Sequence, residues 1–549
     1  MHHSVVDRFR VARGAVFAAA FLVVLAAAPG RNASAAEGAS ASVAAAARNA
    51  DADAVRKLLA EGADVNAPEA DGTSALVWAA YQQSPELVSL LLKAGADPNA
   101  ANNFDVTPLL QAARYGDAAI VKLLLDGGAD RSKATRDGET PLMAAARAGG
   151  VEAVKILLEH GADPNATESL WNQTALMWAT AEGHLDVVDA LLAAGADPNL
   201  KARVTELTKR STRTDFPSGG FTALMWAVRD GNEPIVHRLL EGGADINAKD
   251  GDGATPMMLA IINDRFDLAA KLLDLGADPK LDDSLYEAVE MHDATTDWRA
   301  KDGTRLRSDH PNELTALDLI RILLDKGADP NKPFTGQLHS ASMCCDTKGV
   351  GTPFFRAAVA ADVEGMKLMI EHGADLEWAP KPLEAADGAA APPPGGGNAG
   401  KTPLMVAMDG GKGVGMAGGP GDIREGAKPP FREESNRDPV DAVKLLIKAG
   451  AKVNAVTPKK GESALHLAAE SGKLDVVRAL AAGGADLNLK NKDGKTALQV
   501  VEAQKPRELP TAGAEVSFDK PAQPAEVAAL LRELMKGGLQ ARATEGGAQ

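Results

Sequence analysis

The chain has 549 residues, of which 45% are hydrophobic, 24% are charged and 4% are aromatic. This length exceeds what one hydrophobic core supports, and the composition is that of a folded chain, which excludes global disorder. The net charge of -16 argues against nucleic acid and anionic lipid as partners, because both need a basic face on the protein. The scarcity of aromatic residues favours closely packed helices over strands.

The N-terminal 35 residues have the pattern of a secretory signal peptide. A start containing three arginines is followed by an apolar run over 15–28, and Ala33-Ser34-Ala35 offers a small-residue cleavage site. The apolar run is too short to span a bilayer comfortably, so an N-terminal membrane anchor is the less favoured alternative. We therefore expect 1–35 to be a signal peptide and the mature protein to be exported, periplasmic or secreted, with no membrane span.

The chain has only two cysteines, Cys344 and Cys345, and they are adjacent. Across a trans peptide their Cα atoms are ~3.8 Å apart, whereas an ordinary disulfide needs more than ~4.4 Å. We expect no intrachain disulfide, so packing alone must stabilise the fold.

A fixed-period repeat organises the rest of the sequence. The tripeptide Gly-Ala-Asp recurs along the chain, and its first glycines, Gly62, Gly95 and Gly128, are 33 residues apart. Longer gaps further on correspond to this period plus insertions. A period of this length is typical of repeat proteins in which each repeat is one supersecondary unit.

Residues 137–166 show how one period is expected to fold. Thr140 caps a short first helix, which Gly149-Gly150 ends. A second helix is predicted from Val151 to His160, with Gly161 supplying a left-handed C-cap. Such a helix pair cannot bury its own apolar face, so stability must come from stacking on its neighbours.

These residues resemble the ankyrin repeat family. Its signature Gly-x-Thr-Pro-Leu-x-x-Ala-Ala is matched by residues 138–146, and residues 461–469 match it with the usual histidine, His466. In other units methionine stands at the histidine position: Met143, Met177, Met225, Met258 and Met405. The resemblance implies an all-α ankyrin-repeat solenoid of about twelve helix-turn-helix units over 36–538, with β-hairpin fingers between units. Residues 539–549 are expected to form a flexible C-terminal tail.

Six insertions interrupt the regular period. Three lie between units, where the family projects its fingers, and three lie between the helices of one unit. Their Gly- and Pro-rich composition predicts loops. They either reflect tolerance of loop tips to insertion or decorate a binding face. The six ranges are 201–219, 292–313, 332–349, 379–399, 411–437 and 505–522.

The sequence offers weak matches to catalytic or cofactor motifs. Residues 395–402 fit a phosphate-loop pattern, but a Pro-rich linker precedes them and a repeat begins directly after them. His339, Cys344 and Asp346 are candidate ligands, yet adjacent cysteines rarely satisfy tetrahedral geometry together. We predict no enzyme activity, no cofactor and no metal. The alternative is an enzyme, or a ligand- or metal-binding protein, with its site in the insertions near 332–437.

The resemblance places a binding groove on the concave face, formed by finger tips and by the two positions after Ala-Ala in each first helix. Arg114, Arg147 and Arg229 share one register there. Trp78, Trp178 and Trp226 are expected in the core. The candidate partner-binding residues are Tyr81, Phe104, Arg114, Tyr115, Arg136, Arg147, Trp171, Phe221 and Arg229.

Arg, Tyr and Trp are the residue types enriched at binding hot spots, which makes this groove the predicted site. The alternative is an ordinary solvated face. The predicted function is therefore a non-catalytic periplasmic scaffold that binds a protein partner presenting acidic and apolar groups. No nucleic acid partner is expected, and the sequence does not set the oligomeric state.

Overall fold

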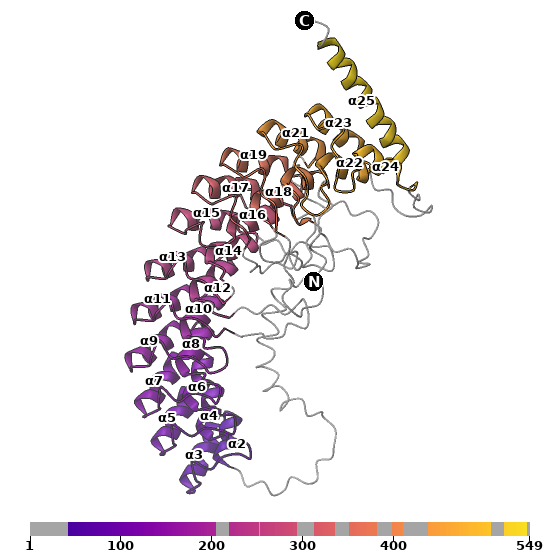
Figure 1. Cartoon of the computed structure of the whole chain (residues 1–549). Helices are drawn as coiled ribbons and strands as arrows, with labels where there is room; N and C mark the ends of the chain where they lie inside the picture. The colour runs from indigo at the N-terminus through magenta and orange to yellow at the C-terminus, as the bar shows by residue number, and fades with distance from the viewer. Residues whose placement is uncertain are drawn as a thin grey trace.

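The computed structural model describes residues 42–204, 219–251, 253–293, 312–334, 351–381, 398–409, 437–506 and 521–545. Within these ranges, α2 to α25 form twelve consecutive helix pairs, which we number as units 1 to 12. The pairs stack into a curved solenoid, with even-numbered helices on the concave side and odd-numbered helices on the convex side (Figure 1). The expected all-α repeat architecture of about twelve units is confirmed.

Each unit contributes one inner and one outer helix. The inner helices are α2 (Val43–Arg48), α4 (Ala75–Tyr81), α6 (Pro108–Arg114), α8 (Pro141–Ala148), α10 (Ala175–Glu182), α12 (Ala223–Asp230), α14 (Pro256–Ile262), α16 (Ser284–Asp293), α18 (Pro353–Val359), α20 (Pro403–Val406, continued by the 3-10 turn η3, Ala407–Asp409), α22 (Ala464–Ser471) and α24 (Ala497–Glu502). The outer helices are α3 (Ala52–Ala60), α5 (Pro85–Lys93), α7 (Ala118–Asp126), α9 (Val151–Glu159), α11 (Leu185–Ala193), α13 (Glu233–Glu241), α15 (Phe266–Asp274), α17 (Ala316–Asp325), α19 (Val363–Glu371), α21 (Pro439–Ala449), α23 (Leu474–Ala482) and α25 (Pro524–Glu545).

Unit 4 folds as its residues predict. The Thr140 hydroxyl accepts the Met143 amide at 3.2 Å and caps α8, while Gly149 ends that helix with a φ of +74°. Gly150 has a further role, because a Cβ atom there would lie 2.5 Å from the Cα of Gly116 in unit 3. Close approach of neighbouring units therefore requires glycine at this position.

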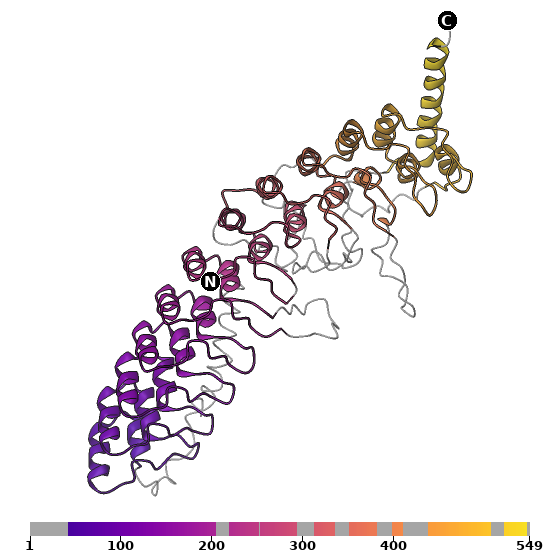
Figure 2. The ribbon, with the colours of Figure 1, turned by 60° about the vertical axis from the view of Figure 1, so that its left-hand side comes forward.

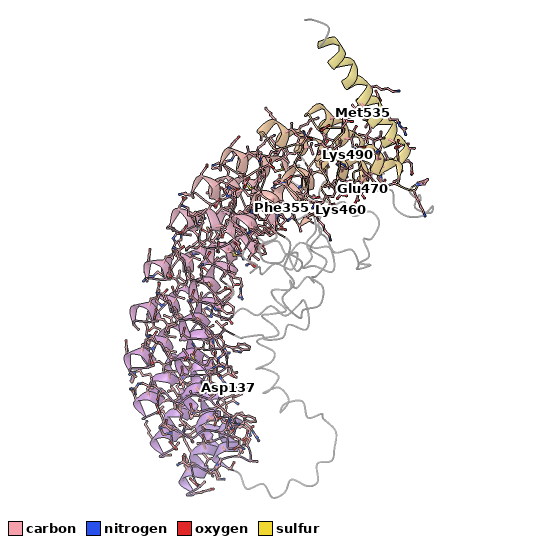
Figure 3. All side chains as sticks on the ribbon, in the orientation of Figure 1. Asp137, Phe355, Lys460, Glu470, Lys490 and Met535 are labelled. Atoms are coloured by element: carbon pink, nitrogen blue, oxygen red, sulfur yellow. The ribbon has the colours of Figure 1, made fainter. Side chains whose placement is uncertain are left out.

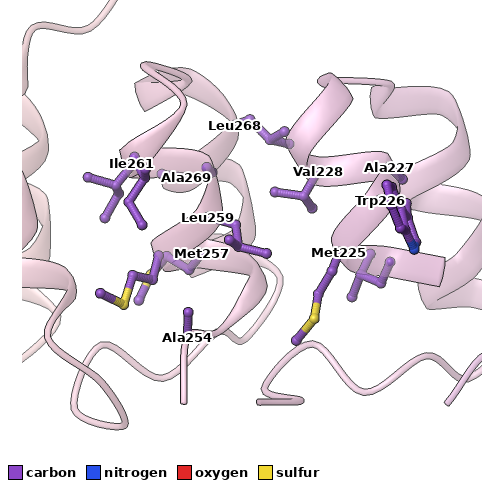
Figure 4. Packing of buried hydrophobic residues seen from close by; sticks show 14 of the residues in the cluster. Met225, Trp226, Ala227, Val228, Ala254, Met257, Leu259, Ile261, Leu268 and Ala269 are labelled. Carbon is purple, nitrogen blue, oxygen red and sulfur yellow. The ribbon is translucent and has the colours of Figure 1, made fainter. Parts of the chain in front are cut away.

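The core is a continuous apolar layer between successive units. Met225 and Val228 on α12 and Leu259 on α14 are buried, and the side chains of the two inner helices fill the space between them (Figure 4). The methionines that replace the family's histidine, including Met225, are buried in this layer. His466, where the histidine remains, is also buried, and its Nε2 lies 3.1 Å from the carbonyl oxygen of Lys495 in the next unit.

The fingers between units are tighter than the expected β-hairpins. Among the described residues there are only two isolated bridges, Thr167 with Thr174 and Val456 with Ser463, and no β-strand. A typical finger is closed by two backbone hydrogen bonds, as from the Thr135 amide to the Glu139 carbonyl and from the Gly138 amide to the Thr135 carbonyl. These turns are too short for a ladder, so the prediction of β-hairpin fingers is corrected to reverse turns. Figure 2 shows them along one side of the solenoid.

An asparagine ladder joins the turns that follow the outer helices. Asn99 illustrates it: its amide donates to the Gly128 carbonyl at 3.0 Å, and its Oδ1 accepts the Asp130 amide at 2.7 Å. The same pair of bonds links Asn199 to Gly243 and Asn331 to Gly373. Those two rungs cross the insertions at 201–219 and 332–349, so stacking continues past both insertions.

A buried polar cluster joins units 8, 9 and 10. His292 at the end of α16 lies with its Nδ1 2.7 Å from Asp362 Oδ2, and both side chains are 1% exposed. Asp362 also caps α19 through the Gly365 amide at 3.1 Å. Arg437, before α21, donates to the His292 carbonyl at 2.5 Å, and Arg356 on α18 forms an ion pair with Glu290 on α16.

Several sequence expectations fall on residues outside the described ranges. These include the signal peptide over 1–35 and most of each insertion. The helix α25 runs from Pro524 to Glu545, so a boundary at residue 538 does not coincide with a helix end. In the described part of the chain, no helix is both long enough and apolar enough to cross a membrane.

Candidate functional site

Four of the predicted binding residues occupy equivalent places on four inner helices. We call the concave surface that these helix ends form the floor of the groove. Tyr81, Arg114 and Arg229 lie in the last turns of α4, α6 and α12, and Arg147 has the same place on α8. Their common register follows from the 33-residue period, which gives each unit the same position on the concave face. The structure therefore brings these four residues onto one surface, as predicted.

Glu139, which the sequence did not single out, neutralises part of this surface. It stands just before the cap of α8, and its side chain is only 8% exposed. One carboxylate oxygen pairs with Arg114 Nη2, and the other lies 3.3 Å from Arg147 Nη2. The two arginines therefore share an internal partner, which links unit 3 to unit 4. The sequence alone suggested that the charge of both arginines is fully available to a binding partner. The structure shows that Glu139 neutralises part of it.

Arginines also cover the faces of the three tryptophans expected in the core. The guanidinium of Arg147 lies 4.9 Å from the ring centre of Trp178, that of Arg229 lies 4.2 Å from Trp226, and that of Arg48 lies 5.9 Å from Trp78. Trp226 is 7% exposed, as expected for a core residue. Trp178 and Trp78 are half-buried and pack against the core, so the core prediction holds only in part for these two. Their indole N–H groups explain this, since each donates to a polar finger residue, Gln173 or Glu69.

Three aromatic residues continue the floor across units 2 and 3. Trp78 contacts Tyr81 edge to face at 5.5 Å between ring centres, and Tyr81 contacts Tyr115 at 6.1 Å. Burial, together with the adjacent Tyr81, raises the pKa of the Tyr115 phenol above its usual value. Tyr115 nevertheless remains 43% exposed, so one of its faces is open to a partner.

The finger tips carry the most exposed apolar side chains of this face. Phe104 is 62% exposed and Trp171 is 54% exposed, as their predicted binding role requires. Arg136 stands between them with 81% of its side chain exposed, and its Nε is 3.5 Å from Asp105. Phe221 differs from the prediction, because it is half-buried and packs on Trp226 with ring centres 5.4 Å apart.

Sequence reasoning missed two exposed neighbours of Trp171. Leu170 is 48% exposed and Val204 is 49% exposed, and the Arg203 amide beside Val204 donates to the Trp171 carbonyl at 2.6 Å. We call Phe104, Arg136, Leu170, Trp171 and Val204 the finger strip. The sequence signal that could have identified Leu170 and Val204 is their position before or within a finger turn. Figure 3 shows Asp137, in the finger between Phe104 and Trp171, on the concave side of the solenoid.

The described residues contain no group of three or more metal-ligating side chains. The alternative candidates His339, Cys344, Cys345 and Asp346 lie outside the described ranges, so the alternative site in the insertions stays a prediction. The side chains of His292 and Asp362 are each 1% exposed, so this pair does not face solvent where a ligand could reach it.

Comparison with known protein families gives matches to a model that describes ankyrin repeats in three copies. The matches cover residues 19–102, 42–134, 109–202, 204–283 and 434–504. These ranges cover more than half of the chain. With the helix pairs, the turns and the ladder described above, they establish that the chain belongs to the ankyrin repeat family. Ankyrin repeats generally mediate protein–protein interaction, which supports a binding scaffold.

Two curated proteins resemble parts of the chain. The Neurogenic locus Notch protein of Drosophila melanogaster is 35% identical over 108 residues, which are 20% of this chain and 4% of that protein. The B-cell lymphoma 3 protein homolog of Mus musculus is 39% identical over 84 residues, 15% of this chain and 18% of that protein. The chain thus spans less than a fifth of the length of either relative.

Proposed function

We propose that this protein is a non-catalytic scaffold that binds another protein on the finger strip and the adjacent floor of units 3 to 6. The observation that carries the proposal is the exposure of Phe104 and Trp171 on the same side of the solenoid. Large apolar side chains gathered on one exposed face mark interaction sites more often than isolated ones do. Five of the eight exposed large hydrophobic residues in the described ranges lie between residues 104 and 204.

The face also meets the energetic conditions for tight binding. Stacked units hold it in place before a partner arrives, so little conformational entropy is lost on association. The Arg114–Glu139–Arg147 arrangement fixes the floor between units 3 and 4. Tyr115 and Trp171 supply large apolar areas with few rotatable bonds, which is the property of hot-spot residues.

Binding should depend on Trp171 and not on the convex side. We expect Trp171→Ala to weaken affinity for the natural partner by about 2 kcal/mol or more, since a buried anchor would be lost. Lys155→Ala is the control, because Lys155 lies on the outer helix α9 and pairs only with Glu152 at 2.7 Å among the described residues. The measurement is calorimetric affinity for a partner isolated with the wild-type chain. Equal affinity of both variants would place the site elsewhere.

We further propose that the protein acts outside the cytoplasm, in the periplasm or as a secreted protein. The support is the N-terminal pattern of arginines, apolar run and Ala33-Ser34-Ala35. We expect N-terminal sequencing of the protein recovered from its source cells to begin at Ala36 or a near neighbour. Recovery of a cytoplasmic chain that retains Met1 would contradict the proposal.

A further inference from the structure

We infer that the finger strip binds an extended, acidic segment of the partner that inserts apolar side chains beside Phe104 and Trp171. This inference rests on the proposed function and specifies the form of its partner. The evidence lies in how the fingers of units 3 and 5 differ from those of units 2 and 4.

The tip position differs in chemistry between these fingers. Units 2 and 4 place Asp71-Gly72 and Asp137-Gly138 at the tip, and both glycines have positive φ, 83° and 86°. Units 3 and 5 place Phe104-Asp105 and Trp171-Asn172 there. Asp105 and Asn172 keep the same left-handed conformation, with φ of 58° and 57°. An aromatic residue thus takes the place of aspartate at the tip. The turn of unit 3 keeps the backbone hydrogen bonds of unit 2, whereas the turn of unit 5 is one residue longer, from Glu168 to Gln173, and both rings are exposed.

Buried polar side chains hold both aromatic fingers rigid. Asn102, 5% exposed, accepts the Phe104 and Val106 amides, each at 3.0 Å. Glu168, also 5% exposed, accepts the amides of Leu170, Trp171 and Gln173 at 2.7 to 2.9 Å.

Neither aromatic tip is part of the hydrophobic core of the described residues. Among these residues, the rings of Phe104 and Trp171 make no aromatic or cation–π contact. These hydrogen bonds hold the backbone of both finger tips in place, while most of the Phe104 ring and about half of the Trp171 side chain stay exposed. A partner that covers them gains their apolar area without having to order the loop.

The fingers of units 3 and 4 lack the backbone hydrogen bond that joins other neighbouring fingers of the described residues. Neighbouring fingers are joined by a backbone bond, as from the Asn103 amide to the Asp71 carbonyl at 2.9 Å and from the Ser169 amide to the Asp137 carbonyl at 2.8 Å. Between units 3 and 4 the described residues show no such bond, so the Phe104 carbonyl and the Arg136 amide stay available. An extended segment can pair with such groups, whereas a helix has already satisfied its own.

Charge favours an acidic occupant. Arg136, Lys201 and Arg203 are exposed along the strip, whereas the acidic groups that face solvent there are exposed Asp137 and half-exposed Asp105. The carboxylate of Glu168 is buried and taken up by backbone amides, so the solvent-facing side of the described strip is more cationic than anionic. The ion pair of Arg136 with Asp105 is long and exposed, so a partner carboxylate can replace Asp105 at little cost.

The spacing of the two rings sets the spacing of the partner's anchors. Phe104 and Trp171 belong to units 3 and 5, and stacked helices are ~8–10 Å apart, so the tips are separated by roughly 16–20 Å. An extended chain advances ~3.3 Å per residue. Because side chains of an extended chain alternate between its two faces, two apolar residues about six positions apart fit the strip, with an acidic residue at an even position between them facing Arg136. A helical segment would need about twelve positions.

The test is selection of phage-displayed random 12-residue peptides on the full-length chain. We expect enrichment of peptides with two apolar residues about six positions apart and Asp or Glu at an even position between them. Their Kd, measured by fluorescence anisotropy, should rise about tenfold or more in Phe104→Ala and in Trp171→Ala. The controls are Leu275→Ala and Val456→Ala, because both side chains are 47% exposed but lie outside the strip. Their Kd should change less than about twofold.

Other results would overturn the inference in distinguishable ways. Enriched peptides that bind both strip variants as tightly as the wild type would show that the strip does not hold them. Enrichment of a twelve-position spacing would identify a helical partner, and no enrichment would exclude a linear segment. In each case the binding function itself is judged separately, by whether the natural partner loses affinity in Trp171→Ala.

Discussion

Replacing Asp362 with alanine is expected to destabilise the centre of the solenoid by about 3–5 kcal/mol. The carboxylate is buried, pairs with His292 at 2.7 Å and caps α19 through Gly365. Its removal leaves His292 buried without this partner, and the first turn of α19 loses its N-cap. Because repeat arrays unfold unit by unit, the measurement is hydrogen exchange across α16 to α19, and not a single melting temperature.

The matched control is Asp117→Ala. Asp117 caps the outer helix α7 in the same way, through the Ile120 amide at 3.0 Å, but is only half-buried and has no histidine partner in the described residues. Its loss should cost about 1 kcal/mol, as an N-cap does. Equal losses for the two variants would show that the pair with His292 adds nothing to the cap.

The pH dependence of the Asp362 effect has a defined sign. Burial alone would raise the pKa of Asp362, but the hydrogen bond and charge of His292, with smaller contributions from Arg437 and the Gly365 amide, lower it overall. A lowered pKa means that the carboxylate contributes its full stability above the ordinary aspartate pKa, near about 3.9, and loses it as pH falls further. The difference between wild type and variant should persist at about pH 5 and shrink below about pH 4.

The local structure was predictable because it depends on residues close in sequence. Thr140, Gly149 and Gly161 each act within one turn of chain, so the start and end of α8 and the start of α9 follow from residues of the same repeat. The end of α25 at Glu545 did not, because the regular period stops before it. The register of Arg114 and Arg147 was equally accessible, since a constant period repeats the same position on every unit. Phe104 and Trp171 were predicted at finger tips on the same basis, and both are exposed there.

Contacts between units were not predictable from one repeat. Glu139 lies only two residues before the first turn of α8, but its pairing with Arg114 joins side chains from two units. Glu139 and Gln173 both stand directly before the N-cap of an inner helix, and Gln173 accepts a hydrogen bond from the Trp178 indole. A polar residue repeated at this position was the signal that the sequence interpretation missed. His292 and Asp362 are 70 residues apart and separated by two insertions, so no periodicity connects them.

Glu139→Gln should loosen the contact between units 3 and 4 by about 2 kcal/mol. The carboxylate is 8% exposed and takes two guanidinium groups, while an amide can accept from only one side and carries no charge. Hydrogen exchange should therefore rise in α6 and α8 together. The control is Glu152→Gln on the outer helix α9, whose exposed pair with Lys155 is expected to contribute less than about 0.5 kcal/mol. Unchanged exchange in both helices would show that the shared carboxylate does not couple the units.

The same substitution also separates two ways in which the face could bind. Glu139 competes with any partner carboxylate for Arg114 and Arg147, so removing its charge should tighten binding of an acidic partner if those arginines contact it. If the finger strip makes the main contacts, affinity should stay within about twofold of the wild type, because the side-chain partners of Glu139 among the described residues are Arg114 and Arg147 and not Phe104 or Trp171. Affinity for the natural partner, measured alongside Trp171→Ala, distinguishes the two: a gain for Glu139→Gln with no loss for Trp171→Ala would move the site from the finger tips to the floor.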